Sequence, residues 1–210
     1  SESNKRKEYQ NPEDPLSPMG REQARIVAKR FKTIPVETIM SSDLPRARVT
    51  AEEIAAVTGK KVIHDKLLRE KLQPSVFWGK QLDEPELLDI KKLMVEKSSD
   101  PNWHHSDEEN YYDVEKRAKA LLSLLAKRKE KHIAVVSHGA FIKTIITYLF
   151  FGDKSSPDYF NRVYNFFWAS NVGITVLEYS NPEITPKNTD ETRRWHLMTW
   201  NDHAHLGELK

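Results

Sequence analysis

Apolar positions along the chain follow two patterns, helical spacing and short uninterrupted runs. Helical spacing first appears in residues 17–31, where Ser17 is placed to cap a helix and Pro18 to open it. Short runs rich in β-branched residues predict buried strands, and they occur at VETIM (36–40), KVIHD (61–65) and HIAVVS (132–137). The chain therefore begins as alternating helices and strands.

The same patterns continue to the end of the chain. Further helices are expected at 45–58 (capped by Ser42 or Asp43 and closed by Gly59), 84–96, 111–130 and 140–151. Residues 152–172 are expected to form a polar, aromatic loop, and residues 173–179 and 193–200 to form two more strands. Alternating strands and helices predict an α/β fold with a mainly parallel sheet between two helical layers. Nothing suggests a linker, so residues 1–210 are expected to form a single domain.

Residues 71–110 differ from the rest in composition. They hold Pro74, Pro85 and Pro101, the acidic run DEPELLD and the polar stretch SSDPNWHHSDEEN. We expect this part to be an insertion that lies over the domain as a lid.

Composition narrows the class of protein. The 210 residues are 38% hydrophobic and 30% charged, and the net charge of +2 is too small for a dedicated nucleic-acid binder. The absence of cysteine excludes disulfides, iron–sulfur clusters and a cysteine nucleophile. The longest apolar run, FIKTIITYLFFG, is too short to span a bilayer, and the first fifteen residues are polar. We expect a cytoplasmic protein, a monomer or homodimer, with neither membrane nor nucleic-acid partners.

The segment KHIAVVSHGAFIKTII is the most informative for chemistry. It predicts a strand that ends in His138-Gly139 at the start of a helix, at the sheet edge where α/β proteins bind ligands. The helix amino terminus offers free N–H groups to an anion, and Gly139 lets the backbone approach it closely. A capping or core histidine is the ordinary alternative for His138.

Two other segments also place a candidate functional side chain just after a predicted strand. In SSDLPRARVTAEEIA, Arg46 and Arg48 lie in the first helical turn on different sides, so one at most faces a ligand; an arginine there can grip phosphate oxygens. In DKLLRE, Glu70 follows a strand and is a candidate proton donor. Taken singly, a surface arginine and a solvated glutamate are the simpler interpretations.

Taken together and in this order, these pieces resemble the histidine phosphatase superfamily, which has the phosphoglycerate mutase-like fold. The matching stretches are SESN, DPLSPMGREQA, SSDLPRARVTAEEIA, LLRE, VVSHGAFI, NVGITVLEY and WHLMTWNDHAHL. The resemblance covers nearly the whole chain except residues 71–110, where such proteins vary their substrate lid.

One departure from the family pattern is important. The family's opening signature is a strand followed by Arg-His-Gly-Glu-Ser/Thr, two variable residues and Asn; Ser1-Glu2-Ser3-Asn4 fits only its end. The first central strand and the nucleophilic histidine are missing from these residues. We expect an amino-terminally truncated sequence, inactive as it stands, rather than a naturally inactive form.

The resemblance implies a phosphomonoesterase that needs no metal or cofactor and acts on a small phosphorylated substrate through a phosphohistidine. Arg46, His138, Gly139 and Asn4 would bind the phosphoryl group, with His138 protonated beside it. Glu70 would protonate the leaving alkoxide and then activate water. The catalytic residues would be Glu70, His138 and Arg46.

Other interpretations stay open. One is a mutase that moves phosphate within a sugar acid, and another is a non-catalytic phosphate-binding or scaffold protein. His203 and His205, with His196, have a spacing that can serve a metal site, although a packing role is simpler. An aromatic set is expected to pack in the core or lid or to form a dimer patch; it comprises Tyr159, Phe160, Tyr164, Phe166, Phe167 and Trp168.

Overall fold

A computed structural model describes residues 8–180 and 194–207 of the chain. Its strands are β1 (Thr38–Ser41), β2 (Val62–His64), β3 (Ile133–Val136), β4 (Ile174–Tyr179) and β5 (Trp195–Asp202). Its α-helices are α2 (Pro18–Arg30), α3 (Pro45–Thr58), α4 (Pro85–Glu96), α5 (Tyr111–Ala126), α6 (Gly139–Phe151) and α7 (Pro157–Phe166). The α/β class is confirmed, and α5 ends four residues earlier than the sequence suggested.

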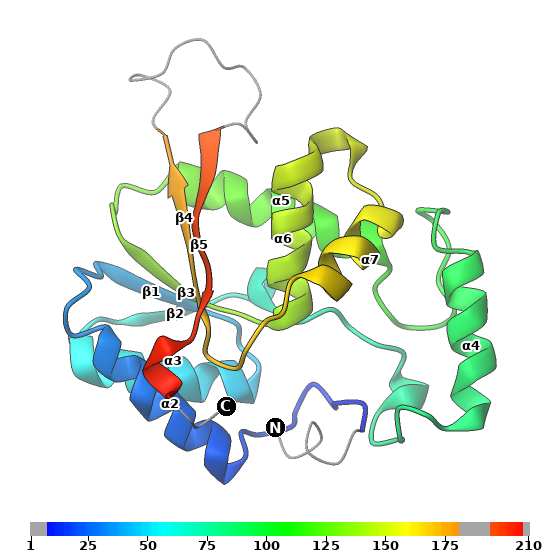
Figure 1. Cartoon of the computed structure of the whole chain (residues 1–210), viewed down its shortest axis with the longest axis horizontal. Coiled ribbons are helices and arrows are strands. Elements are labelled where there is room, and N and C mark those ends of the chain that lie inside the picture. Colours follow the sequence, from blue (N-terminus) through cyan, green and yellow to red (C-terminus); the bar gives the residue numbers. More distant parts are fainter. Residues whose placement is uncertain (1–7, 181–193, 208–210) are drawn as a thin grey trace.

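The three-stranded parallel sheet is centred on β1. Its order is β2-β1-β3, and Ser41 at the end of β1 lies in register with His64 of β2 and Val136 of β3. The carboxyl ends of the strands therefore meet at one edge of the sheet, where α3 and α6 begin (Figure 1).

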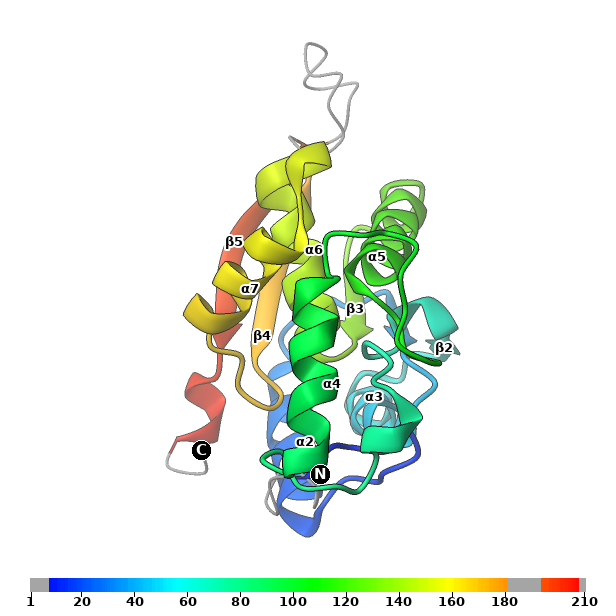
Figure 2. The same ribbon diagram turned by 90° about the vertical axis from the view of Figure 1, so that its right-hand side faces the viewer.

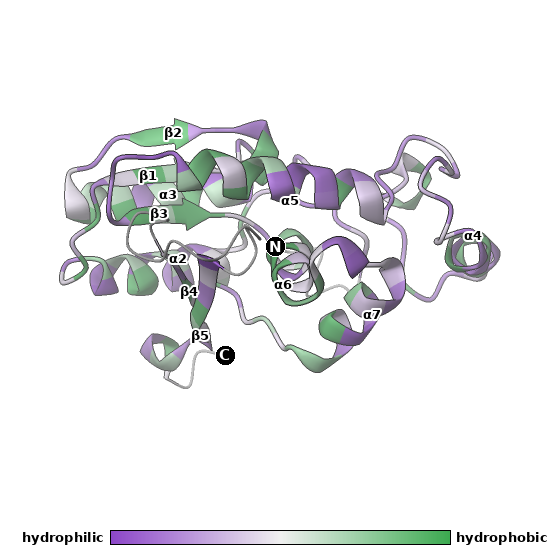
Figure 3. Ribbon diagram, turned by 90° about the horizontal axis from the view of Figure 1, so that it is seen from above, coloured by the Kyte–Doolittle hydropathy of each residue, from purple (hydrophilic) through white to green (hydrophobic). Residues whose placement is uncertain are grey.

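The two faces of the sheet are covered by different helices. Side chains alternate along β1, so Ile39 packs with residues of α2 and α3, and Met40 packs with residues of α5 and α6. Both side chains are fully buried. The layers are visible in Figure 3, where the apolar strands β1 and β3 lie among α2, α3 and α5. This gives the expected helix–sheet–helix arrangement.

The last two strands form a separate ribbon. β4 and β5 pair with each other antiparallel, with Tyr179 opposite Trp195. In the described part of the chain, β3 pairs only with β1 and β4 only with β5. The sheet expected from the sequence as one mainly parallel unit is thus divided into two parts in the described residues.

The stretch 71–110, expected to be an insertion, leaves and rejoins the rest of the chain at one place. The N–H of Glu109 donates to the carbonyl of Leu72 at 3.1 Å, and the N–H of Leu72 donates to the Glu109 carboxylate at 3.0 Å. Between these ends lie a short 3-10 turn, η2 (Ser75–Phe77), and α4, which agrees with the expected helix. α4 lies at the periphery, on the same side as α7 (Figure 2).

Two local expectations are wrong. Residues 152–172 are not a loop throughout, because α7 occupies Pro157–Phe166, capped by the hydroxyl of Ser156. The residue that precedes α3 is Leu44, with no side-chain cap; Ser42 instead accepts the N–H of Leu44, and Asp43 binds Arg69. The caps at Ser17 and Gly59 are confirmed, the latter with a left-handed φ of 68°. Within the described residues, no helix has the length and apolar character needed to cross a membrane.

Candidate functional site

His138 lies at the end of β3, directly before α6. Its Nε2 is 2.9 Å from the hydroxyl oxygen of Ser42, which follows the neighbouring strand β1. Only 8% of the residue is exposed. Burial, together with the charges of Arg46 and Arg117, lowers the pKa of His138 to about 3, so the imidazole is neutral without a ligand. A phosphate anion beside the imidazole would raise the pKa of His138.

Arg46 enters the site from the first turn of α3. Its Nη1 donates to the carbonyl of Pro12 at 3.0 Å. Burial lowers the pKa of Arg46, and the charges of Glu70, Asp14 and Glu13 oppose that change. Arg48 is exposed. The expectation that one of these two arginines at most faces the site agrees with this arrangement.

Glu70 follows the short turn η1 (Lys66–Leu68) and reaches the amino terminus of α6. Its carboxylate accepts the N–H groups of Phe141 at 3.1 Å, Ala140 at 3.3 Å and Lys71 at 2.9 Å. The positive end of the α6 dipole favours a carboxylate here. The sequence suggested that these helix N–H groups would be free for phosphate, but in the structure Glu70 occupies two of them.

Arg46, Glu70 and His138, from three separate segments, therefore lie around one edge of the sheet. Gly139 adjoins them, and a Cβ placed on it would meet no atom within 4 Å, so the space beside this backbone is open. Asn4, the remaining expected ligand of phosphate, lies outside the described residues.

Sequence reasoning missed Arg117, which holds the Glu70 segment in place. This arginine of α5 makes paired hydrogen bonds with the Glu109 carboxylate at 2.6 and 2.7 Å. Its other N–H groups donate to the carbonyls of Leu67 at 2.8 Å and Arg69 at 3.0 Å. Its guanidinium also lies 4.8 Å from the ring centre of Phe141. Arg117 thus fastens η1 to α5 immediately before Glu70.

Two further contacts, also missed, attach this segment to the strand ends. Arg69 and Asp43 form a bidentate pair at 2.6 Å, which lowers the pKa of Asp43. The hydroxyl of Ser137 donates to the carbonyl of Leu68 at 2.8 Å. The loop that carries Glu70 is therefore fixed to the ends of both β1 and β3.

Lys143 is a further cation on α6, the helix whose first N–H groups bind Glu70. It lies one turn into α6, and its Nζ donates to the carbonyl of Tyr164 on α7 at 3.0 Å. Burial lowers the pKa of Lys143, and the charge of Glu70 opposes that change. The charges of Arg46, Arg117 and Lys143 thus act on His138 or Glu70, and those of nearby carboxylates partly offset them. Arginine and lysine side chains of this kind can bind phosphate oxygens.

No metal-binding group of three or more acidic, histidine or cysteine side chains occurs in residues 8–180 and 194–207. The expected histidine set does not converge on one point. His203 bonds the carbonyl of Asn201, His196 bonds the hydroxyl of Ser180, and the half-buried His205 bonds neither of the other two rings. The possible metal site of the sequence is therefore not formed by these residues.

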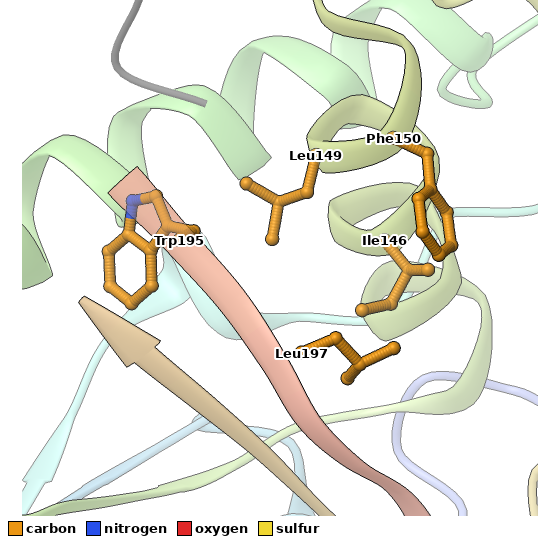
Figure 4. Close-up of a pocket in the computed structure, with 5 residues that line it drawn as sticks. All are labelled: Ile146, Leu149, Phe150, Trp195 and Leu197. Atoms are coloured by element: carbon orange, nitrogen blue, oxygen red, sulfur yellow. The ribbon is translucent and has the colours of Figure 1, made fainter. Parts of the chain in front are cut away.

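The aromatic set is only partly packed. Phe167 contacts the ring of Trp200 at 5.3 Å, whereas Phe166 and Trp168 are largely exposed at the end of α7. A small hollow of about 60 Å³ lies nearby, where side chains of α6 and β5 face each other (Figure 4). Its lining is apolar and holds no charged group, so it offers no chemistry: Ile146, Leu149, Phe150, Trp195 and Leu197.

Fold and site together define an α/β protein with Arg46, Glu70 and His138 gathered at the carboxyl edge of a parallel sheet. Residues 1–192 match the histidine phosphatase superfamily (branch 1), and the chain belongs to this family.

The chain is also similar in sequence to individual proteins of known family. The chain is 31% identical over 137 residues to the probable phosphoglycerate mutase GpmB of Serratia proteamaculans, a match that covers 64% of this chain and 63% of that protein. The chain thus spans less than two thirds of that relative's length.

Solved structures agree with the fold. A phosphoserine phosphatase variant from Entamoeba histolytica, in complex with phosphoserine, has a TM-score of 0.73 and 27% identity, covering 98% of this chain and 94% of that one. YhfR of Bacillus stearothermophilus has a TM-score of 0.77 at 21% identity, over 98% and 94% of the two chains.

Proposed function

We propose that this protein hydrolyses phosphate monoesters in two steps, through a phosphohistidine. The observation that carries the proposal is the convergence of Arg46, Glu70 and His138, from three distant segments, at one edge of the sheet. Phosphoryl transfer to and from a histidine needs groups that neutralise the phosphoryl oxygens and a group that transfers protons. Arg46 and His138 can fill the first role, and Glu70 can fill the second.

Arg46 and His138 bind the phosphoryl oxygens. Arg46 supplies a permanent positive charge, and His138 gains a proton when the phosphate dianion takes its place beside it. Both groups neutralise the charge on the oxygens as the phosphorus–oxygen bond breaks. These two side chains thereby supply the charge stabilisation that the first step needs, and Asn4 donates a further hydrogen bond to the phosphoryl group.

Glu70 transfers the protons. In the first step its carboxyl group protonates the leaving alkoxide while the histidine nitrogen bonds to phosphorus. In the second step the resulting carboxylate takes a proton from water, whose oxygen attacks phosphorus and releases the histidine and inorganic phosphate. The contact with the first N–H groups of α6 keeps the carboxylate beside the phosphoryl site.

The nucleophile in this proposal is a histidine on a strand that precedes Ser1. The strand would lie between β3 and β4, each of which has one strand neighbour in the described part of the chain. Among the other histidines, His64 is exposed at the outer strand β2, and His104 is bonded to Asp113. Neither is placed next to His138 on the sheet.

A phosphoglycerate mutase activity is the second candidate, because the match to GpmB favours it. A mutase must retain the phosphorylated intermediate under its lid. The insertion at 71–110 is modest in length, and the phosphoserine phosphatase from Entamoeba histolytica aligns over nearly the whole chain. These features support the hydrolase.

The test uses the protein expressed with the residues encoded before Ser1. Release of inorganic phosphate from a panel of monoesters is compared with isomerisation of 3-phosphoglycerate. We expect phosphate release to dominate, and Arg46→Ala to lower it by on the order of 10²-fold or more. Dominant isomerisation would favour the mutase, and phosphate binding without turnover would leave a non-catalytic phosphate-binding protein. An upstream coding sequence with no strand followed by Arg-His-Gly/Ala-Glu would remove the proposed nucleophile.

A further inference from the structure

The loops that precede β1, β2 and β3 meet at the amino edge of the parallel sheet, opposite the edge that carries His138. The N–H of Glu37 donates to the carbonyl of His132 at 2.9 Å, which joins the loops before β1 and β3. β2 begins at Val62, in register with Ile39 of β1, so the loop before β2 ends at the same edge. This edge lies at the end of the sheet that is far from α4 (Figure 1; Figure 3).

The charged side chains that these three loops expose are mainly lysines. Six lysines are exposed to solvent here: Lys32, Lys60, Lys61, Lys127, Lys129 and Lys131. Basic runs that are short and separate in the sequence are thus brought together in space. The net charge of +2 conceals this concentration, because it is the sum over the whole chain.

The two carboxylates of these loops are already bound within the protein. Glu130 makes paired hydrogen bonds with Arg128. Glu37 accepts the backbone N–H groups of Lys131 and His132. Within residues 8–180 and 194–207, none of the six lysines forms an ion pair. Their ammonium groups are therefore available to an external anion.

Neither helix ends nor packing accounts for these lysines. A cation stabilises the carboxyl end of a helix mainly within the last turn, and α3 and α5 have no basic residue there. The apolar side chains of the same segments turn inward instead, as Phe31, Ile34 and Val57 pack on the core around Ile39. The lysines thus form an outward surface over a fixed base.

The chemistry of this surface fits an anionic lipid headgroup layer better than a nucleic acid. Lysine offers mobile point charges, whereas arginine makes paired contacts to single phosphates, and Arg128 is held by Glu130. None of the three loops exposes a large apolar or aromatic side chain on which bases could stack. Lys32 and Lys60 follow the helices on one face of the sheet and Lys129 follows α5 on the other, so the charges spread over an area.

We propose that this basic edge, defined by the six lysines, binds the surface of an anionic phospholipid bilayer. Each basic residue near such a surface adds to the attraction, and salt screens it. The carboxyl edge, with Arg46, Glu70 and His138, then faces away from the lipid. The expectation that there is no membrane partner came from the lack of an apolar span, which adsorption through charge does not need. The inference does not depend on the proposed function.

Sedimentation with vesicles tests this inference. The protein is mixed with vesicles of phosphatidylcholine alone or of phosphatidylcholine with about 30% phosphatidylserine. We expect binding only to the anionic vesicles and its loss at about 0.5 M NaCl. Lys60→Gln/Lys129→Gln, which removes one lysine from each of two loops, should weaken the binding about 30-fold.

The matched control is Lys92→Gln/Lys97→Gln. These lysines are exposed on α4 and at its end, far from the basic edge, and their loss changes the net charge equally. The control should bind anionic vesicles almost as the unmodified chain does. Absence of binding to anionic vesicles, or an equal loss in the two double variants, would overturn the inference. Tighter binding to polyuridine RNA than to these vesicles at the same ionic strength would also overturn it, in favour of a nucleic-acid partner.

A single cysteine can report which part of the protein meets the lipid, because the chain has none of its own. Thr33→Cys, next to Lys32, and Ser99→Cys, just after α4, each carry a fluorophore at an exposed position. Lipids with spin-labelled headgroups should quench the label at position 33 strongly and the label at position 99 little. Equal quenching at the two positions would contradict the assignment to the basic edge.

Discussion

The imidazole of His138 and the hydroxyl of Ser42 lie 2.9 Å apart, across the ends of two adjacent strands. Ser42 is fully buried, and its oxygen also accepts the N–H of Leu44 at 3.2 Å. The hydroxyl proton can therefore point to Nε2 when the imidazole is neutral, and the oxygen can accept from Nε2 when the ring is protonated. Ser42 is thus a positioning residue that fits both states of His138.

Replacing the Ser42 hydroxyl should weaken the binding of phosphate. We expect Ser42→Ala to lower the affinity for inorganic phosphate about tenfold, since one hydrogen bond to a charged group is worth about 1.5 kcal/mol or more. The matched control is Ser41→Ala, because the Ser41 hydroxyl is equally buried but donates to the carbonyl of Ser42. Calorimetry over a range of pH measures both variants. The same loss in both variants would argue against a specific role for Ser42.

Loss of the acid–base carboxyl group should separate binding from turnover. Glu70→Gln keeps an oxygen that can accept the N–H groups of Lys71 and Phe141, but it cannot exchange a proton. In the protein with its upstream residues, phosphatase activity should fall about 10²–10⁴-fold. Affinity for inorganic phosphate should change little. Activity equal to that of the wild type would remove Glu70 from the mechanism.

Burial of His138 makes stability depend on pH. Its pKa is about 3 in the folded protein, against an ordinary value near 6.5, so between these values the unfolded chain binds a proton that the folded protein does not. The free energy of unfolding should therefore decrease as the pH falls from 6.5 toward 3, by up to about 1.4 kcal/mol per pH unit from this group.

The comparison that isolates His138 is His138→Gln, which should reduce the slope of stability against pH. Denaturant unfolding at several pH values measures it. Carboxylates with lowered pKa, such as Asp43 and Asp202, lose stabilisation in the same direction at low pH, and they remain present in both proteins. His64→Gln, at an exposed position, is the control. An unchanged slope in His138→Gln would show that the imidazole does not titrate as described.

Arg117 should contribute to both stability and activity. Arg117→Met leaves the half-buried Glu109 carboxylate without its ion-pair partner and removes donors from the carbonyls of Leu67 and Arg69. We expect the free energy of unfolding to fall by about 2 kcal/mol, and turnover to fall because Glu70 is less well placed. Adding Glu109→Gln should restore part of the stability, because the unpaired charge is then gone. A double variant no more stable than Arg117→Met would contradict the pairing.

Local signals in the sequence predicted most of the elements. Ser17-Pro18 and Gly59 mark helix ends through backbone chemistry that acts within a few residues, and both are confirmed. Ser156-Pro157 carries the same starting signal as Ser17-Pro18, yet the aromatic, polar composition after it obscured α7. The direction of β4 and β5 depends on pairing between strands, which residue spacing alone does not encode.

The site was only partly predictable, because some of its contacts join residues that are far apart in the sequence. Arg46, Glu70 and His138 each follow a predicted strand, so the geometry of a parallel sheet brings them to one edge. Arg117 sits in the middle of a helix, 48 residues beyond the Arg69 carbonyl that it binds, and no local pattern marks it. The pairing of Glu70 with the start of α6 likewise depends on tertiary structure, and it reversed the expectation for the helix N–H groups.

The reciprocal hydrogen bonds between Leu72 and Glu109 hold together the two ends of the stretch 71–110. Changes of length or sequence between these two positions are therefore expected to leave in place the strand ends that carry Ser42 and His138. In the proposed function, the residues that bind phosphate and the stretch between Leu72 and Glu109 can then be altered separately.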